Sequence, residues 1–269
     1  MKTLQFEVCV ETLEAARAAE AGGADRIELC ANLSVGGVTP SFDLMAATVG
    51  AVAIPVHVLI RPREGDFVFS EAEFELMKVQ IKEAKRAGAA GVAVGVLQAD
   101  FRVDVTRSRE LVELARPMKT TFHRAFDETP NIADALEDVI ATGADCLLTS
   151  GGEANVLTGS ESIARVCRLA KGRLDVMAGG GLRLENLAEV VRKTGISFLH
   201  GSLNRKDSDG WLSPPNGSVA EGKSEVLKED VREALRLFQQ EFEAREVPAP
   251  ACGETISMTG MTQQPLTHE

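Results

Sequence analysis

The chain has 269 residues, of which 44% are hydrophobic and 26% are charged, so it contains enough apolar material for one substantial core. Its net charge of -11 argues against a general nucleic-acid binder and against docking on an anionic membrane, because both need clustered Lys and Arg. The sequence has no run of about 18 apolar residues and no charged region ahead of a long apolar stretch. We therefore expect neither a transmembrane helix nor a secretory signal.

Short β-branched, apolar runs alternate with amphipathic stretches along the chain. Strands are predicted at 4–10, 26–30, 55–60, 91–96, 119–123, 146–149, 174–178 and 198–201. Helices are predicted at 12–21, 41–49, 70–87, 105–116, 131–142, 159–171, 184–193 and 224–244. Eight strands alternating with eight helices predict an α/β fold, a single-domain (β/α)8 TIM-type barrel. An open doubly wound sheet would need a glycine-rich turn after its first strand, and residues 9–12 contain no glycine.

Several short segments mark where the predicted helices and the domain end. Glycine recurs where a helix passes into the next strand, as at 21–25, 87–90, 142–145 and 194–197, and glycine is the residue expected just past a helix end. Residues 204–223 are rich in Asp, Ser, Gly, Pro and Asn and predict an inserted loop before the last helix. Residues 247–269 predict a disordered tail. The barrel is therefore assigned to residues 1–246.

Ligands of such barrels bind at the C-terminal ends of the strands, and this chain places many polar residues there. Glu28, His123 and Asp127 are candidate acids or bases if the protein is an enzyme, since carboxylates and imidazoles do this work. Guanidinium groups and glycine-loop N–H groups suit carboxylate and phosphate oxygens, so an anion site is predicted. Its candidate residues are Glu7, Arg61, Arg63, Arg124, Ser150, Gly179, Gly180, Gly181 and Ser202. As a structural alternative, Glu7 and Glu28 would pair with Arg61 and His57 inside the barrel.

Cysteines occur singly at positions 9, 30, 146, 167 and 252, which is neither a disulfide framework nor a C-x-x-C zinc pattern. Cys9 and Cys30 lie on the first two strands, whose neighbouring chains are about 5 Å apart in a sheet. Both thiols would then reach one ion, and thiolates are soft ligands that select Cu(I). Packing as small buried hydrophobes is the alternative. Cys146 and Cys167 are expected to be packing residues.

Seven motifs occur in the order found in the CutC copper homeostasis family, and together they resemble it over about residues 4–203. They are residues 7–9, 23–30, 36–41, 60–67, 121–127, 148–151 and 177–181. The resemblance implies a (β/α)8 barrel that binds copper, as Cu(I), and forms dimers or tetramers. It also implies a cytoplasmic location that extends to the nucleus in eukaryotes. The family's copper-linked cysteine corresponds to Cys30, and its first-strand cysteine to Cys9. Some members carry two consecutive cysteines there, whereas this chain has Cys9-Val10.

Two hypotheses follow from the sequence. The first is a copper homeostasis protein with Cu(I) held by Cys9 and Cys30. The second is an enzyme that acts on a small anionic metabolite, phosphorylated or carboxylated, at the C-terminal rim. The sequence does not decide whether the barrel catalyses a reaction.

Overall fold

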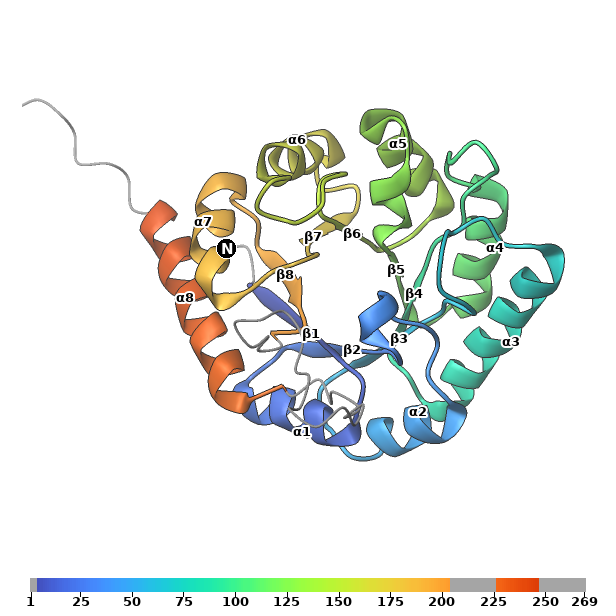
Figure 1. The fold of residues 1–269 in the computed structure, drawn as a ribbon, viewed down its shortest axis with the longest axis horizontal. Coiled ribbons are helices and arrows are strands. Elements are labelled where there is room, and N and C mark those ends of the chain that lie inside the picture. The colour runs from blue at the N-terminus through green and yellow to red at the C-terminus, as the bar shows by residue number, and fades with distance from the viewer. Residues whose placement is uncertain (1–3, 204–225, 247–269) are drawn as a thin grey trace, which may run out of the picture.

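The computed structural model describes residues 4–203 and 226–246, and all its named strands belong to one closed barrel. Consecutive strands pair in parallel, and β8 pairs with β1 to close the sheet. The predicted (β/α)8 barrel is thereby confirmed (Figure 1). The strands are β1 (Gln5–Val10), β2 (Arg26–Leu29), β3 (Val56–Leu59), β4 (Gly91–Val94), β5 (Lys119–Phe122), β6 (Cys146–Thr149), β7 (Asp175–Ala178) and β8 (Phe198–Gly201).

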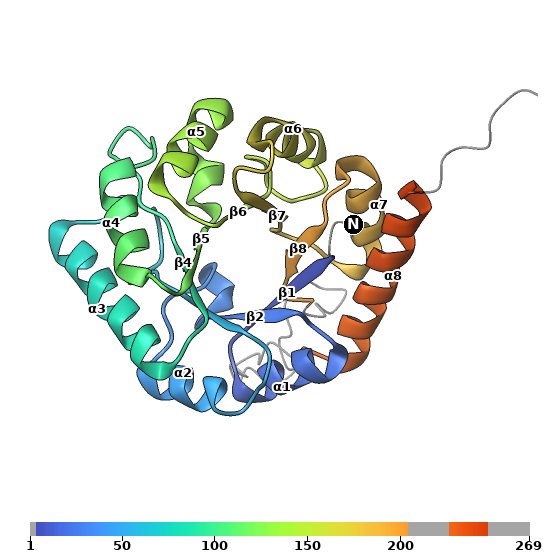
Figure 2. The same cartoon turned by 180° about the vertical axis from the view of Figure 1, so that it is seen from behind.

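The helices form a ring around the barrel in chain order, and the view from behind shows the same ring (Figures 1 and 2). They are α1 (Leu13–Gly22), α2 (Phe42–Val49), α3 (Glu71–Ala87), α4 (Val105–Ala115), α5 (Ile132–Thr142), α6 (Ser160–Ala170), α7 (Leu184–Thr194) and α8 (Lys228–Glu246). Helix α8 packs against α7 and α1 and closes the ring. Two 3-10 turns, η1 (Leu33–Val35) and η2 (Arg124–Glu128), lie in the loops after β2 and β5.

Local sequence signals set the ends of these helices. Ser70 caps α3 through a capping box with Glu73, and Asn131 accepts hydrogen bonds from the first turn of α5. At the other end, Gly23 and Gly143 adopt left-handed backbone conformations just past α1 and α5, which confirms the predicted role of these junction glycines. These signals define where α3 and α5 begin and where α1 and α5 end.

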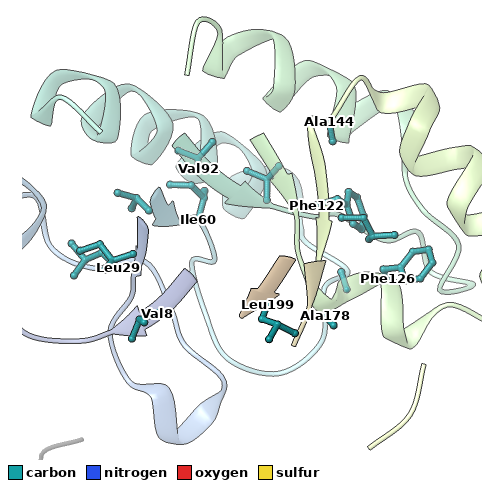
Figure 3. Close-up of a cluster of buried hydrophobic side chains, with 14 of the residues drawn as sticks. Val8, Leu29, Ile60, Val92, Phe122, Phe126, Ala144, Ala178 and Leu199 are labelled. Carbon is teal, nitrogen blue, oxygen red and sulfur yellow. The ribbon is translucent and has the colours of Figure 1, made fainter. Parts of the chain in front are cut away.

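The strands divide their side chains between two environments. Outward-facing residues such as Val8, Leu29, Val92 and Phe122 are fully buried in the layer between sheet and helices (Figure 3). Alternate residues face the barrel interior, and there the chain places buried polar and titratable side chains, including Glu7, Glu28, His57 and His200. The outer layer is therefore the hydrophobic core, whereas the barrel interior contains buried polar groups.

Two predictions concern segments outside the described residues, namely the inserted loop at 204–223 and the tail at 247–269. The last helix begins at Lys228, four residues later than predicted. Among the helices that the structure describes, none is long and apolar enough to cross a membrane.

Candidate functional site

The thiols of Cys9 and Cys30 lie together inside the barrel. Cys9 is in register with Glu28 on the neighbouring strand, and the N–H of Cys30 donates to the carbonyl of Val10. The two Sγ atoms are 3.5 Å apart, and the side chains are only 3% and 0% exposed. Both cysteines are free, so two buried thiols lie side by side between β1 and β2.

The loop between β2 and α2 covers these thiols. Gly37 approaches so closely that an added Cβ atom would lie 3.6 Å from Sγ of Cys30 and 2.8 Å from Leu59. Arg61 fixes this loop, because its Nη1 donates to the carbonyls of Val35 and Gly37 at 3.1 and 2.9 Å. Its Nη2 donates to the carbonyl of Gly65 in the next loop. Arg61 therefore joins two loops above the thiols.

A line of charged groups continues from the thiols across β1, β2 and β8. Sγ of Cys9 lies 3.4 Å from Oε2 of Glu28, and that carboxylate oxygen lies 3.8 Å from Nε2 of His200. Nδ1 of His200 is 2.7 Å from Glu7, whose other oxygen accepts from Nε of Arg26. One potential ligand atom from each of Cys9, Glu28 and His200 lies within 4.8 Å of the others.

Burial and charge determine the protonation of this cluster. Burial alone would raise the pKa of Glu7, but Arg26 and His200 outweigh it and lower that pKa to about 2. Burial alone would lower the pKa of His200, whereas Cys9, Glu28 and Glu7 raise it well above the ordinary value. Burial raises the pKa of Glu28. Hydrogen bonding to Cys30, together with burial, raises the pKa of Cys9 well above its usual range, so Cys9 is a thiol at neutral pH.

The predicted pairing of Glu7 with Arg61 is wrong. Glu7 contacts Arg26 and His200, because both lie beside it on the strands that flank β1. Arg61 lies beyond the end of β3, where loop carbonyls take up its donors. Glu28 is in register with His57, but its close side-chain contacts are Cys9 and His200.

The predicted rim arginines do not form one group. Arg63 donates to Asp66 and to Glu73 on α3, and its guanidinium lies 5.2 Å above the ring of Phe69. Arg124 instead lies at the end of β5, where it donates to Asp127 and to Ser150. The nearby carboxylate of Asp127 also accepts hydrogen bonds from Thr149, Ser150 and Gly152. Glu28 lies on β2, where it contacts Cys9 and His200, whereas His123 and Asp127 follow β5, and no hydrogen bond or ion pair joins Glu28 to either of them in the described part of the chain.

Two buried histidines line the interior beside β4. The ring of His57 lies against Gly91, and the ring of His123 lies against Gly95, because an added Cβ at either glycine would lie within 2.7 Å of ring atoms. His57 Nδ1 and His123 Nε2 have no hydrogen-bond partner in the described part of the chain. Burial lowers the pKa of His57 to about 4 and, together with Arg61, that of His123 to about 3. Both imidazoles are neutral at physiological pH.

Comparison with known proteins gives the family. The model of the CutC family matches residues 4–205. This chain belongs to the CutC family. It is 44% identical over 219 residues to the human protein named copper homeostasis protein cutC homolog, covering 81% of this chain and 80% of that one. It is also 44% identical over 198 residues to a family protein CutC of Vibrio cholerae, covering 73% and 78%.

A solved structure supports the same assignment. The putative copper homeostasis protein CutC of Streptococcus agalactiae superposes with a TM-score of 0.70 at 28% identity, over 74% of this chain and 99% of the other.

Two members of the thiol and carboxylate cluster in this CutC chain, Arg26 and His200, were not predicted from the sequence. A usable signal existed, since both are polar residues at interior positions of the strands next to Glu7.

Proposed function

We propose that this CutC family protein takes part in copper homeostasis and binds Cu(I) between Cys9 and Cys30. The observation that carries the proposal is the 3.5 Å separation of the two buried Sγ atoms. Thiolates are soft ligands that favour Cu(I) among the common cellular metals. The names of the human and Streptococcus relatives support the link to copper.

The neighbouring groups favour a two-thiolate site over a four-ligand zinc site. Both ring nitrogens of His200 are directed at carboxylates, Nδ1 at Glu7 and Nε2 at Glu28, so the imidazole is already engaged. Structural zinc usually takes four ligands in a tetrahedron. His200 and Arg26 instead supply positive charge near the site, which offsets the charge of thiolates formed on metal binding.

We place the protein in the cytoplasm, with access to the nucleus if the host is a eukaryote. Cys9 and Cys30 are free thiols that lie in contact without a bond, which suits a reducing compartment. The dimer or tetramer expected from the family stays a prediction. Light scattering of the full chain in solution would measure it.

Competition for Cu(I) tests the proposed function. The reduced full chain is titrated with Cu(I) in the presence of a chromophoric Cu(I) chelator, and we expect one tightly held ion per chain. Cys9→Ser and Cys30→Ser should each weaken binding at least tenfold. Cys146→Ser is the matched control, because Cys146 is equally buried but lies on β6. Cys252→Ser controls for a thiol outside the described residues. Unchanged affinity in Cys30→Ser would rule the proposal out.

A further inference from the structure

His123 presents a buried hydrogen-bond donor that nothing in the described chain satisfies. Its Nδ1 accepts from the backbone N–H of Ala125 at 3.2 Å, which leaves the proton of the neutral ring on Nε2. The Nδ1–Cε1 edge faces Gly95, so the Nε2 edge is turned away from the β4 wall. The residue is only 3% exposed, and Nε2 has no partner. Leaving a buried donor unpaired is costly, so a bound group that accepts from Nε2 is favoured.

Arg124 follows directly and adds a partly free cation. Its Nε and Nη2 donate to Asp127 and Ser150, while Nη1 donates to no residue that the structure describes. The side chain is 42% exposed, in contrast to the 6% exposure of Asp127. The guanidinium is therefore oriented by its buried partners, while part of the side chain stays exposed and Nη1 is available to a ligand.

The loop after β7 brings backbone donors to this guanidinium. Gly180 has a φ of 99°, and an added Cβ would lie 2.9 Å from Cζ of Arg124, so glycine is required for this approach. The N–H groups of Gly180 and Gly181 make no hydrogen bond with any residue in 4–203 or 226–246. Just after β8, the Ser202 hydroxyl is likewise unpartnered within those ranges.

We infer that the C-terminal ends of β5 to β7 form a binding site for the anionic group of a small metabolite, a phosphate or a carboxylate. His123 Nε2–H, Arg124 Nη1 and the N–H groups of Gly180 and Gly181 are the donors. Neutral N–H groups and a guanidinium are the donors that protein sites use for such oxyanions. Loops after the later strands of (β/α)8 barrels often carry this role.

This site is separate from the thiols. Cys9 and Cys30 lie between β1 and β2, whereas His123 and Arg124 follow β5, on the opposite side of the closed barrel (Figure 1). It also differs from the anion site expected from sequence, since Arg61 and Arg63 donate to their own loops and to α3. Because Asp127 offsets part of the charge of Arg124, we expect weak, millimolar binding of an isolated anion and tighter binding of a whole metabolite.

Calorimetric titration of the full chain with inorganic phosphate, and separately with acetate, tests the site. His123→Asn keeps an acceptor for the Ala125 N–H but removes the Nε2 donor, whereas His123→Gln places an amide where Nε2 stands. We expect His123→Asn and Arg124→Gln each to weaken binding by about tenfold or more, the loss typical of a hydrogen bond to a charged group. His123→Gln should stay within a few fold of the unmodified chain.

Arg173→Gln is the matched control for charge, since Arg173 is 41% exposed and also pairs with a carboxylate, but lies after α6. Far-ultraviolet circular dichroism verifies that each variant is folded. Phosphate binding that depends on His123 and Arg124 supports a phosphate site, and the same dependence with acetate supports a carboxylate site. The inference is overturned if neither anion binds at tens of millimolar, or if binding is equal in all variants. Cu(I) affinity is measured separately, so failure here leaves the thiol proposal untouched.

Discussion

Nδ1 of His200 lies 2.7 Å from Oε1 of Glu7, although the two residues are 193 positions apart in the chain. They meet because β8 pairs with β1 to close the barrel, with Glu7 and His200 in register. The other oxygen of Glu7 accepts from Arg26 on β2. One buried carboxylate thus joins three strands across the closure of the sheet.

Replacing this carboxylate should strongly destabilise the barrel. Glu7→Gln removes the negative charge that neutralises Arg26 and His200 in the barrel interior. Breaking a buried ion pair in this way lowers the free energy of unfolding by about 3–5 kcal/mol. Urea unfolding measures the loss. Glu137→Gln is the control, because Glu137 pairs with Arg173 while 60% exposed, and its loss should cost less than about 1 kcal/mol. Equally small losses of unfolding free energy in both variants would show that the Glu7 carboxylate does not stabilise the barrel.

The interior histidines should differ in protonation. We expect the imidazoles of His57 and His123 to stay neutral from pH 7 down to pH 5, because burial lowers their pKa values to about 4 and about 3. His200 should be protonated at pH 7, because Cys9, Glu28 and Glu7 together outweigh burial and raise its pKa. Nitrogen-15 NMR of the three rings reads this directly. A ring of His57 or His123 that titrates near pH 6.5 would contradict the prediction.

The lowered pKa of His123 makes the free energy of unfolding depend on pH. The folded pKa of His123 lies below the value of 6.5 for an exposed histidine, so the unfolded chain takes up the proton first as pH falls. Protonation of His123 in the unfolded chain therefore destabilises the fold progressively below pH 6.5. Between pH 6.5 and 4.5 the unmodified chain should lose up to roughly 2–3 kcal/mol of unfolding free energy relative to His123→Asn, because Asn does not titrate at position 123. Parallel unfolding curves at several pH values measure this difference, and a constant difference would refute it.

Sequence reasoning succeeded where a simple repeating pattern controlled the outcome. Alternating side chains on parallel neighbours placed Cys9 and Cys30 on the same side of adjacent strands, and the structure confirms the contact. The hydrogen-bond partners of Arg61 could not be predicted in this way. They are the carbonyls of Val35, Gly37 and Gly65, and no repeating sequence pattern indicates the conformation of the loops that carry them. Arg26 was overlooked because it begins its strand, at the end of the barrel where ligands are not expected.

Arg61 should control access to the thiols. Arg61→Gln removes the charged donors that hold Val35 and Gly37 over Cys30, so local opening of this loop becomes easier. We expect Cys30 in the native chain to react several times faster with iodoacetamide, followed by mass spectrometry. Arg63→Gln is the control, because Arg63 donates within the next loop and to α3. The free energy of global unfolding is measured on the same samples, and a rate increase explained entirely by it would contradict a local cover.

Asp127 should stabilise the fold and take no direct part in chemistry. Its carboxylate accepts hydrogen bonds from the hydroxyl and backbone of Ser150, from Thr149, and from the N–H of Gly152, and it pairs with Arg124. Asp127→Asn turns one acceptor into a donor that faces other donors, which should cost on the order of 2–3 kcal/mol of unfolding free energy. Asp134→Asn is the control, because Asp134 accepts one exposed bond from Asn131. A residue kept for catalysis would be replaceable without this loss, so an unchanged midpoint in Asp127→Asn would return Asp127 to the list of candidate acids.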